Sequence, residues 1–559
     1  MQELSGRKAL LNILHDEGVE YIFGNPGTTE LPLMDALVEH PEFTYVLGLQ
    51  ESVAMAMADG YSRASGRLSV ANFHVAPGLG NAIGAIYNAK FFGAPVLVTA
   101  GQQEQGLGLT EPMLHDDLVK MAAPVTKWAT EATRVQDLPR ILRRAAKVAL
   151  TPPTGPVFVS LPRDVLLASA EVDLGGRTRV DSAVRPGDEA LARLAERLLA
   201  AERSVIVAGH DVYSQDAFQE LARVADLLGA AVYSQTVPYV AVFPSDHPLF
   251  MGELSRIQTQ VRGILEGHDL LFEVGSDNLR MAVPSPVEPL PPGMPVVALG
   301  LRDWELAKNY PAALALHGDA KTTLAALAPL LQARRTPAQA EAARRRAAAI
   351  QGKNWSAKRA ALEAKTRDRA AAQPIAPEHL MLEIARAMPR EGVVVEEGLT
   401  STRSLLSFLD ITHRQRFYGL ASGGIGFALA GAVGIQLALR ERPLLAVIGD
   451  GSALYSIQAL WTAAHLKLPI TFVIANNRSY RILKERLHAL GGPAAAQGRF
   501  PAMDFRDPPI EFVGLARSLG VPARQVTAPG DVAPALREAL AAQDGPRLLD
   551  VLVEDGLKL

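Results

Sequence analysis

Short apolar runs alternate with longer helix-like segments along most of the chain. Examples are YIFGN (21–25), LSVANFH (68–74), SVIVAGHDV (204–212) and PLLAVIGD (443–450), each followed by a segment of helical character. Strands that alternate with helices in this way pair in parallel and are covered by helices on both faces. The sequence therefore predicts the α/β class, with a mainly parallel sheet flanked by helices in each domain.

The alternation is interrupted at two places, which divides the 559 residues into three α/β domains. We expect a first domain over residues 1–170, a central domain over 189–332 and a third domain over 375–559. Residues 333–374 are rich in Ala, Arg, Glu and Lys and contain no strand-like run. For this segment we expect a solvated linker with a helix in it.

Composition and charge exclude several classes of protein. The formal net charge is −3 and the two signs are interspersed, so nucleic acid is not an expected partner. The chain has no cysteine, which excludes disulfides, thiolate metal sites and a cysteine nucleophile. The N-terminal residues lack the apolar run of a secretory signal, and the most apolar segment, 423–439, is too short for a bilayer span. We therefore expect a cytoplasmic protein without a membrane partner.

The most informative local pattern joins two strand ends in the third domain. One buried strand ends in Gly449-Asp450-Gly451, and the next ends in a pair of asparagines, of which Asn477 follows Asp450 by 27 residues. Both ends emerge at the carboxyl edge of a parallel sheet, where such folds bind ligands. The Asp450 carboxylate, the Asn477 amide and the Ser479 carbonyl supply oxygens of the kind that Mg²⁺ prefers, and the glycines admit a diphosphate. Taken singly, the Gly-Asp-Gly motif is equally well explained by an Asp that caps a helix, and the asparagine pair by a turn.

The paired motifs resemble the cofactor motif of thiamine diphosphate-dependent enzymes of the pyruvate decarboxylase and acetolactate synthase superfamily. The segments FGNPGTTELP (23–32), GLQESVAMAMADGYSRASG (48–66) and NFHVAPGLGNAIGAIYNA (72–89) resemble the pyrimidine-binding domain of this family. GGIGFALAGAVGIQLA (423–438) and IGDGSALYSIQALWTAA (448–464) are particularly similar to benzoylformate decarboxylases. The resemblance covers all three domains.

This resemblance implies an enzyme that binds thiamine diphosphate and Mg²⁺, with Ca²⁺ as an alternative occupant, and decarboxylates a 2-oxo acid to an aldehyde without oxidation. It implies that two subunits build each site, so we expect an obligate dimer and, following the family, a tetramer. Carboligation, an acetolactate synthase-like reaction and cleavage of a 2-hydroxyacyl-coenzyme A are alternatives. A catalytically silent relative that binds the cofactor is a more remote one.

Three residues of the first domain match catalytic positions of the family. Glu51, in GLQES, matches the glutamate that hydrogen-bonds the aminopyrimidine ring and promotes formation of the reactive ylide. His74, in NFHVAPG, matches one of two catalytic histidines of benzoylformate decarboxylases and is a candidate for proton transfer. Thr28, in NPGTTE, retains the hydroxyl of an active-site serine. Without the resemblance they would be an acid at a helix start, a packed histidine and a turn residue.

The resemblance also implies cofactor contacts in the third domain. Ile425, in GGIGF, matches the bulky apolar residue that bends the cofactor, and the Gly423 carbonyl matches an acceptor for its amino group. Thr400, in EGLTST, matches a residue beside the diphosphate, whereas Leu399 departs from the polar residue of benzoylformate decarboxylases. The other expected cofactor contacts are Gly449, Asp450, Gly451, Ser452, Asn477, Ser479 and Tyr480, of which Asp450, Asn477 and Ser479 also bind the metal.

Two departures from benzoylformate decarboxylases bear on the substrate. The second catalytic histidine of that family would fall near Met281 or Ala282, where this chain has none, and this gives weight to carboligation. A small alanine and an aromatic pocket residue are replaced by Ile482 and Arg486. A larger aliphatic group and a cation narrow the phenyl pocket and favour an anionic or polar substrate.

A redox enzyme is the rival interpretation. GLGNAIG (78–84) follows a strand-like run, but it has one residue too many for a dinucleotide fingerprint and no acidic residue ends the next strand. This reading leaves the pairing of Asp450 with Asn477 unexplained. FAD in the central domain, as in acetolactate synthases, stays an open and less favoured alternative that a flavin absorbance band in the pure protein would decide.

Overall fold

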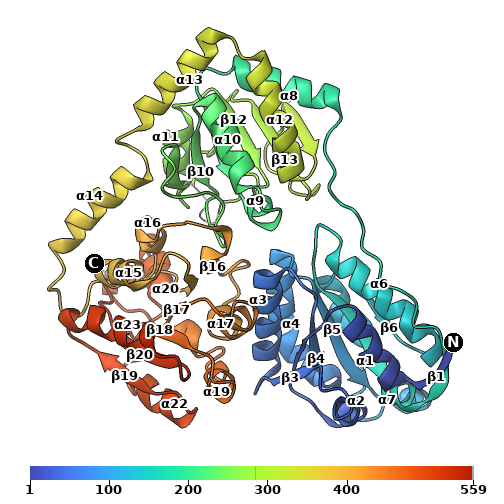
Figure 1. Ribbon diagram of the computed structural model, residues 1–559. Coiled ribbons are helices and arrows are strands. Elements are labelled where there is room, and N and C mark those ends of the chain that lie inside the picture. Colours follow the sequence, from blue (N-terminus) through green and yellow to red (C-terminus); the bar gives the residue numbers. More distant parts are fainter. Residues whose placement is uncertain (282, 284, 557–559) are drawn as a thin grey trace.

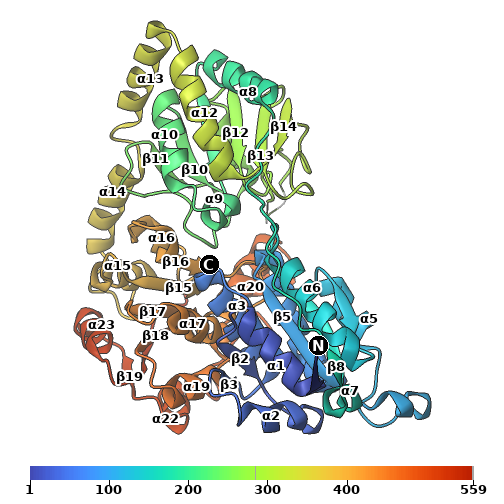
Figure 2. The ribbon, with the colours of Figure 1, turned by 45° about the vertical axis from the view of Figure 1, so that its right-hand side comes forward.

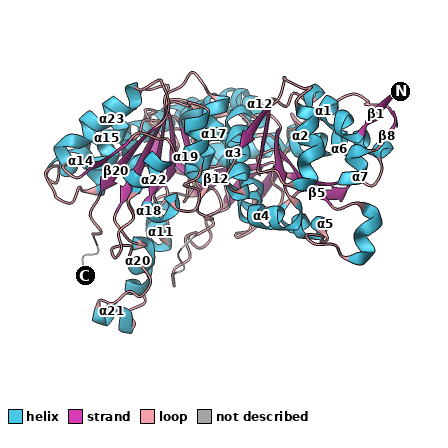
Figure 3. Ribbon diagram, turned by 90° about the horizontal axis from the view of Figure 1, so that it is seen from below, coloured by secondary structure: helices cyan, strands magenta, loops and turns pink. Residues whose placement is uncertain are grey.

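The computed structural model of the protein describes residues 1–281, 283 and 285–556. It contains three α/β domains, each built on a six-stranded parallel sheet with helices on both faces (Figures 1 and 3). The predicted α/β class is confirmed. The first and third domains lie side by side, and the central domain lies across one end of the pair (Figure 1). Within the described ranges, no helix combines the length and apolar character needed to cross a membrane.

The first domain places two predicted catalytic residues at one edge of its sheet, which has the order β3-β2-β4-β5-β7-β6. Helix α3 follows β3 and helix α4 follows β4, so Glu51 and His74 both lie at the carboxyl edge. The strands are β1 (Gln2–Ser5), β2 (Tyr21–Gly24), β3 (Thr44–Leu47), β4 (Ser69–Phe73), β5 (Val96–Gln102), β6 (Ala129–Glu131), β7 (Val157–Pro162) and β8 (Ser169–Val172), of which β1 and β8 form a separate antiparallel pair. The helices are α1 (Gly6–Asp16), α2 (Leu31–Leu37), α3 (Glu51–Ser65), α4 (Val75–Phe92), α5 (Leu118–Ala122), α6 (Leu138–Leu150) and α7 (Arg163–Leu167).

The central domain has the strand order β11-β10-β9-β12-β13-β14. An extended segment, residues 173–187, carries the chain into it from the first domain (Figure 2). The strands are β9 (Ser204–Ala208), β10 (Ala231–Ser234), β11 (Phe250–Glu253), β12 (Leu270–Val274), β13 (Val296–Gly300) and β14 (Leu314–His317). The helices are α8 (Asp188–Ala200), α9 (His210–Ser214), α10 (Phe218–Leu228), α11 (Gln258–Leu265) and α12 (Ala320–Arg334).

The third domain has the strand order β16-β15-β17-β18-β20-β19. Strands β17 and β18 are parallel neighbours in which Gly449 pairs with Ala475, so the two polar motifs emerge next to each other. The strands are β15 (Val393–Glu397), β16 (Phe417–Gly419), β17 (Leu444–Gly449), β18 (Ile470–Asn476), β19 (Ala523–Val526) and β20 (Arg547–Leu552). The helices are α15 (Pro377–Ala387), α16 (Leu405–Phe408), α17 (Phe427–Ala438), α18 (Asp450–Ala453), α19 (Ala459–His465), α20 (Arg481–Ala489), α21 (Pro493–Gln497), α22 (Phe512–Ser518) and α23 (Val532–Ala541). Helices α20 and α21 project away from the sheet (Figure 3).

The segment between the central and third domains contains two helices, α13 (Pro337–Ile350) and α14 (Trp355–Arg367). Helix α13 packs on the central domain, where the Gln339 side chain donates to the Leu199 carbonyl at 2.8 Å. At the start of α14, the buried Trp355 indole donates to the Leu406 carbonyl of the third domain at 2.9 Å. The segment is therefore packed against both domains and contains two helices, where a solvated linker with one helix was expected. The domain limits themselves stay predictions.

Helices α3 and α17 bring the first and third domains into direct backbone contact. A Cβ atom added at Gly434 would lie 1.9 Å from the Met57 carbonyl oxygen, and one added at Gly60 would lie 2.2 Å from the Gly431 carbonyl oxygen. These distances are far below van der Waals contact, so only glycine allows the two helices to approach this closely. Residues Phe427–Leu437 of α17 are all buried.

A buried ion pair lies at the same interface. Asp59 and Arg63, one turn apart on α3, have fully buried side chains whose charged atoms are 2.5 Å apart. The Arg63 guanidinium also lies over the rings of Phe92 and Phe427 and donates to the Gly419 carbonyl at 3.3 Å. A buried charge pair is retained only where its hydrogen bonds are satisfied, and here both domains contribute to satisfying them.

Replacing Gly434 by alanine tests the packing of α3 against α17. We expect Gly434→Ala to lower the free energy of unfolding by about 2–3 kcal/mol, because the added methyl group must push the helices apart. Urea unfolding followed by tryptophan fluorescence measures the change.

Gly514→Ala on α22 is the matched control, because the nearest atom to its added Cβ is 3.9 Å away. The control should be neutral or slightly stabilising, since alanine favours helix over glycine. Equal unfolding midpoints for the two variants would contradict the proposed contact.

Candidate functional site

A small cavity of about 40 Å³ lies at the carboxyl edge of the third sheet. It is lined by the predicted cofactor residues of this domain with the exception of Gly423, together with five neighbours. The lining residues are Gly398, Leu399, Thr400, Ser401, Ile425, Gly449, Asp450, Gly451, Ser452, Asn477, Ser479, Tyr480, Arg481 and Ile482. Four segments of the chain thus meet around one cavity, and the first and last lining residues, Gly398 and Ile482, are 84 positions apart in the sequence.

Asp450 offers a buried carboxylate oxygen to this cavity. Its Oδ1 atom accepts a hydrogen bond from the backbone N–H of Gly451 at 2.8 Å. Its Oδ2 atom is buried and has no hydrogen-bond partner in the described part of the chain. Burial raises the pKa of Asp450 to about 6. An unpaired buried oxygen of this kind needs an explanation, and a bound cation would supply its missing partner.

Asn477 and Ser479 supply neutral oxygen atoms at the same place. The Asn477 Oδ1 atom accepts from the Ser479 backbone N–H at 2.9 Å, so the turn that follows β18 is closed by its own side chain. Among the described residues, no group of three or more His, Asp or Glu side chains forms a metal site. One carboxylate combined with an amide and a carbonyl fits Mg²⁺, which keeps phosphate and water oxygens in its other positions.

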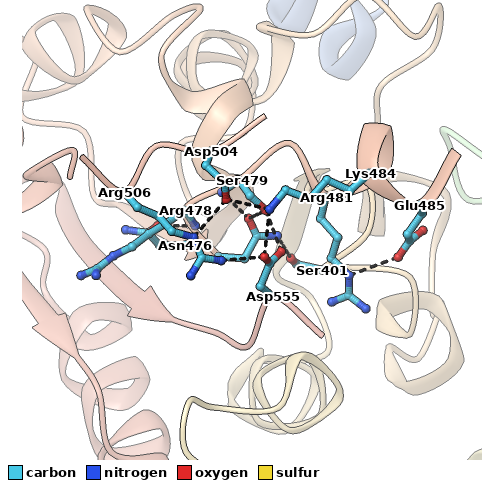
Figure 4. A network of polar contacts seen from close by, with 11 residues as sticks. Ser401, Asn476, Arg478, Ser479, Arg481, Lys484, Glu485, Asp504, Arg506 and Asp555 are labelled. Carbon is cyan, nitrogen blue, oxygen red and sulfur yellow. Dashed lines mark hydrogen bonds and ion pairs between the residues drawn. The ribbon is translucent and has the colours of Figure 1, made fainter. Parts of the chain in front are cut away.

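A polar network fixes the loop that carries Ser479 (Figure 4). The buried Lys484 ammonium donates to Asp504 at 2.7 Å and to Asp555 at 3.1 Å. Asp555 also accepts from the Ser479 hydroxyl at 2.6 Å and from the Arg506 guanidinium at 2.6 Å. This network holds the Ser479 side chain in place and was not predicted from the sequence.

The loop that carries Gly423 and Ile425 is held from both sides. The buried Glu397 carboxylate accepts from the backbone N–H groups of Gly426 at 2.5 Å and Ala428 at 2.7 Å, and burial raises the pKa of Glu397 to about 7. From the first domain, the Asn88 side chain accepts from the Ser422 hydroxyl at 2.9 Å. Ile425 lines the cavity, whereas Gly423 is exposed with a φ angle of 86°.

Glu51 is the first residue of α3, and only 8% of its surface is exposed. The side chain of the preceding Gln50 caps the helix by accepting from the N–H groups of Ser52 and Val53. The Glu51 carboxylate accepts from the amides of Asn25 at 3.2 Å and Asn81 at 3.0 Å. Two neutral donors therefore fix the carboxylate without an ion pair.

His74 lies between β4 and α4 and is paired with a carboxylate. Its Nδ1 atom is 2.9 Å from Glu30 Oε2 and 3.0 Å from the Thr29 hydroxyl. The buried Glu30 also accepts from the backbone N–H groups of Gly27 and Gly101, both at 2.9 Å. Thr28 is exposed beside this group. Thr29 and Glu30 were not predicted as site residues, although both lie in the segment NPGTTE beside Thr28.

The two halves of the predicted site come from different domains and do not line one common cavity in the described part of the chain. Glu51, His74 and Thr28 are not part of the lining of the cavity that holds Asp450. These three residues lie in the first domain, whereas the predicted metal ligands lie in the third. The expectation that two subunits build each site stays a prediction.

Three family models match the chain. The N-terminal thiamine pyrophosphate-binding domain of thiamine pyrophosphate enzymes matches residues 4–121, the central domain matches 191–327 and the C-terminal thiamine pyrophosphate-binding domain matches 400–551. The chain belongs to the thiamine diphosphate-dependent enzymes. The recognition made from the sequence is therefore confirmed.

Individual relatives cover the full length of this thiamine diphosphate-dependent enzyme. Benzoylformate decarboxylase of Pseudomonas aeruginosa is 33% identical over 546 residues, which are 97% of this chain and 98% of the relative. Acetolactate synthase isozyme 3 large subunit of Escherichia coli is 26% identical over 570 residues, covering 99% and 96%. Among solved structures, the thiamine diphosphate-dependent 4-hydroxybenzoylformate decarboxylase of Rhodococcus jostii has a TM-score of 0.86 at 32% identity, with 99% of each chain covered. The benzoylformate decarboxylase of Polynucleobacter necessarius has a TM-score of 0.87 at 27% identity and the same coverage.

The predicted substrate residues of this enzyme fall in two different places. Ile482 lines the small cavity, whereas Arg486 lines a second cavity of about 860 Å³ between the central and third domains. Of the two positions expected for the missing histidine, Met281 is half-buried and Ala282 lies outside the described residues. Val283, next along the chain, lines the second cavity.

Replacing Asp555 by asparagine tests whether the Lys484 network supports the metal site. We expect Asp555→Asn to raise the Mg²⁺ concentration needed for half-maximal thiamine diphosphate binding by about 10-fold, because groups that orient metal ligands have effects of this size. Quenching of tryptophan fluorescence on cofactor addition measures this without any turnover.

Asp544→Asn removes an equal charge from an exposed residue that pairs with Arg547, and it serves as the control. The control should bind Mg²⁺ and cofactor like the unaltered enzyme. If Asp555→Asn did the same, the network would have only a structural role.

Proposed function

We propose that the protein is a Mg²⁺- and thiamine diphosphate-dependent, non-oxidative decarboxylase of a 2-oxo acid that forms an aldehyde. The observation that carries this proposal is the unpaired, buried Oδ2 atom of Asp450, next to Asn477 and the Ser479 loop. Decarboxylases among its full-length relatives support the choice of reaction.

The third domain fits the metal and the diphosphate. Asp450, Asn477 and the Ser479 carbonyl would hold Mg²⁺, and the backbone around Gly449 and Gly451 leaves room for phosphate oxygens. When bound, thiamine diphosphate supplies a nucleophilic carbon that adds to the substrate carbonyl and an electron sink that permits loss of carbon dioxide.

Glu51 would activate the cofactor by hydrogen-bonding its pyrimidine ring. Asn25 and Asn81 hold the carboxylate in place, and its low exposure strengthens any hydrogen bond that it makes. The resemblance implies that the first domain of one subunit faces the third domain of another, so in this role Glu51 would act across a subunit interface. We therefore propose an obligate dimer, in a tetramer, which light scattering would test.

His74 would exchange a proton with the substrate. Since Glu30 is an acceptor and the Thr29 hydroxyl already donates to it at 2.8 Å, Nδ1 of His74 carries the proton in this network. Nε2 is then the nitrogen left for proton transfer. Thr28, exposed beside it, would contribute a hydroxyl to the same substrate face.

Carboligation is the second candidate function. The chain has no histidine near Met281 or Ala282, where the resemblance places a second catalytic histidine, and slower protonation would leave more time for addition to a second carbonyl. A large cavity next to the small one offers space for a second carbonyl compound or an acyl-coenzyme A. Product analysis with an added aldehyde distinguishes release of aldehyde from formation of a 2-hydroxy ketone.

The first test is carbon dioxide release from benzoylformate and from short or anionic 2-oxo acids. The protein is stripped with chelator and assayed with Mg²⁺, thiamine diphosphate, both or neither. We expect release from at least one 2-oxo acid only when both are present. Turnover that is indifferent to both additions, or absent with every acid and acceptor, would refute the proposed function.

Replacing Glu51 by glutamine tests its catalytic role. We expect Glu51→Gln to lower kcat by at least about 100-fold while cofactor binding and the unfolding midpoint change little, since the amide retains the shape but loses the charge. Glu538→Gln, at an exposed surface position, is the control and should retain full activity. A Glu51→Gln variant with normal turnover would remove this residue from the mechanism.

A further inference from the structure

The large cavity between the central and third domains adjoins the cofactor cavity. Leu399 lines both of them, so the two spaces share a wall. One side of the large cavity comes from residues 253–264 of the central domain, and the other comes from residues 396–406 and the helix α20. A group that extends from the small cavity toward the large one would pass this shared wall.

Helix α20 connects the two cavities along one face. Ile482 lines the cofactor cavity and Arg486 lines the large one. Residues four apart on a helix lie on the same face, about 6 Å apart along its axis. A molecule that passes Ile482 on its way out of the cofactor cavity meets the Arg486 guanidinium next.

Three of the other charged groups that line the large cavity already have hydrogen-bond or ion-pair partners. Glu396 accepts from the Gly398 N–H and from the Thr402 hydroxyl. Glu485 accepts from Arg403 at 2.6 Å and from Arg481 at 3.1 Å.

Two arginines of this cavity have no such partner. Arg256 lies on the opposite wall, three residues after Glu253, and belongs to the central domain rather than to the helix that also lines the cofactor cavity. Arg486 has no carboxylate within ion-pair distance in the part of the chain that the structure describes, whereas Arg481 and Lys484 of the same helix both form ion pairs. It is exposed and faces the cavity as a guanidinium without a counter-ion.

We propose that Arg486 binds a second anionic group of the substrate, so that the enzyme prefers 2-oxo acids with a carboxylate at the end distant from the reacting carbonyl. A planar guanidinium recognises a carboxylate by paired, charge-assisted hydrogen bonds. The proposal rests on the proposed function, since it extends the substrate of the same site. It also gives a reason for a cation at a position that is aromatic in benzoylformate decarboxylases.

Matched substrate pairs test this preference. In each pair a terminal carboxylate is replaced by a methyl group: 2-oxoadipate with 2-oxohexanoate, and 4-carboxybenzoylformate with 4-methylbenzoylformate. We expect kcat/KM to favour the dianionic member of at least one pair by about 10-fold or more, which is the effect of a hydrogen bond to a charged group. In Arg486→Gln the ratio should fall to about one, and in Arg486→Lys it should be partly retained.

Arg499→Gln is the control for loss of a nearby positive charge. Arg499 is exposed, follows α21 and lines neither cavity. This variant should keep the substrate ratio of the unaltered enzyme. A ratio near one in the unaltered enzyme, or a ratio that survives Arg486→Gln, would overturn the proposal while leaving cofactor-dependent decarboxylation intact.

A binding measurement separates the failure of this proposal from the failure of the proposed function. If no 2-oxo acid is turned over, the decarboxylase assignment fails, and calorimetric binding of adipate against hexanoate decides the role of Arg486. Tighter binding of adipate that is lost in Arg486→Gln and kept in Arg499→Gln would support the anion site. Equal affinity for adipate and hexanoate would contradict the proposed anion site at Arg486.

Discussion

The backbone contact between α3 and α17 fixes both halves of the site relative to each other. Glu51 begins α3, and the loop that carries Ile425 leads directly into α17. Since Gly434 leaves no space for a side chain, sterics determine the separation of the two helices. The buried Asp59–Arg63 pair and the Asn88–Ser422 hydrogen bond then fix their orientation. One chain thereby positions the predicted catalytic carboxylate at one end of a rigid unit and the predicted cofactor-binding loop at the other.

The sequence predicted the interior of each sheet but not all of its edges. The buried strands β4, β9 and β17 were recognised because their apolar residues are continuous. The edge strands β6, β11, β14 and β19 were missed. They have three or four residues each and pair on one side only, so they need no continuous apolar run. The packed helices between the second and third domains were likewise seen only as one helix in a solvated linker.

The parts of the site that are local in sequence could be predicted, and the parts that depend on tertiary contacts could not. Asp450 and Asn477 end neighbouring strands, so strand pairing alone brings them together. Lys484 and Asp555, by contrast, are 71 residues apart, and only the folded chain shows that they support Ser479. The resemblance placed Arg486 in a phenyl pocket, whereas the helix direction carries its side chain into a separate and larger space.

Helix α14 has a consequence for how this enzyme can evolve. Trp355 hydrogen-bonds to Leu406 on one wall of the large cavity, while Lys358 donates to the Met251 carbonyl, in the strand that leads to the other wall. The helix thus acts as a spacer that sets the width between the walls. A change in the bulk or length of α14 would alter the width of the large cavity without moving the residues that line the small one. The range of molecules that fit the large cavity could therefore change during evolution while the predicted catalytic residues stay in place.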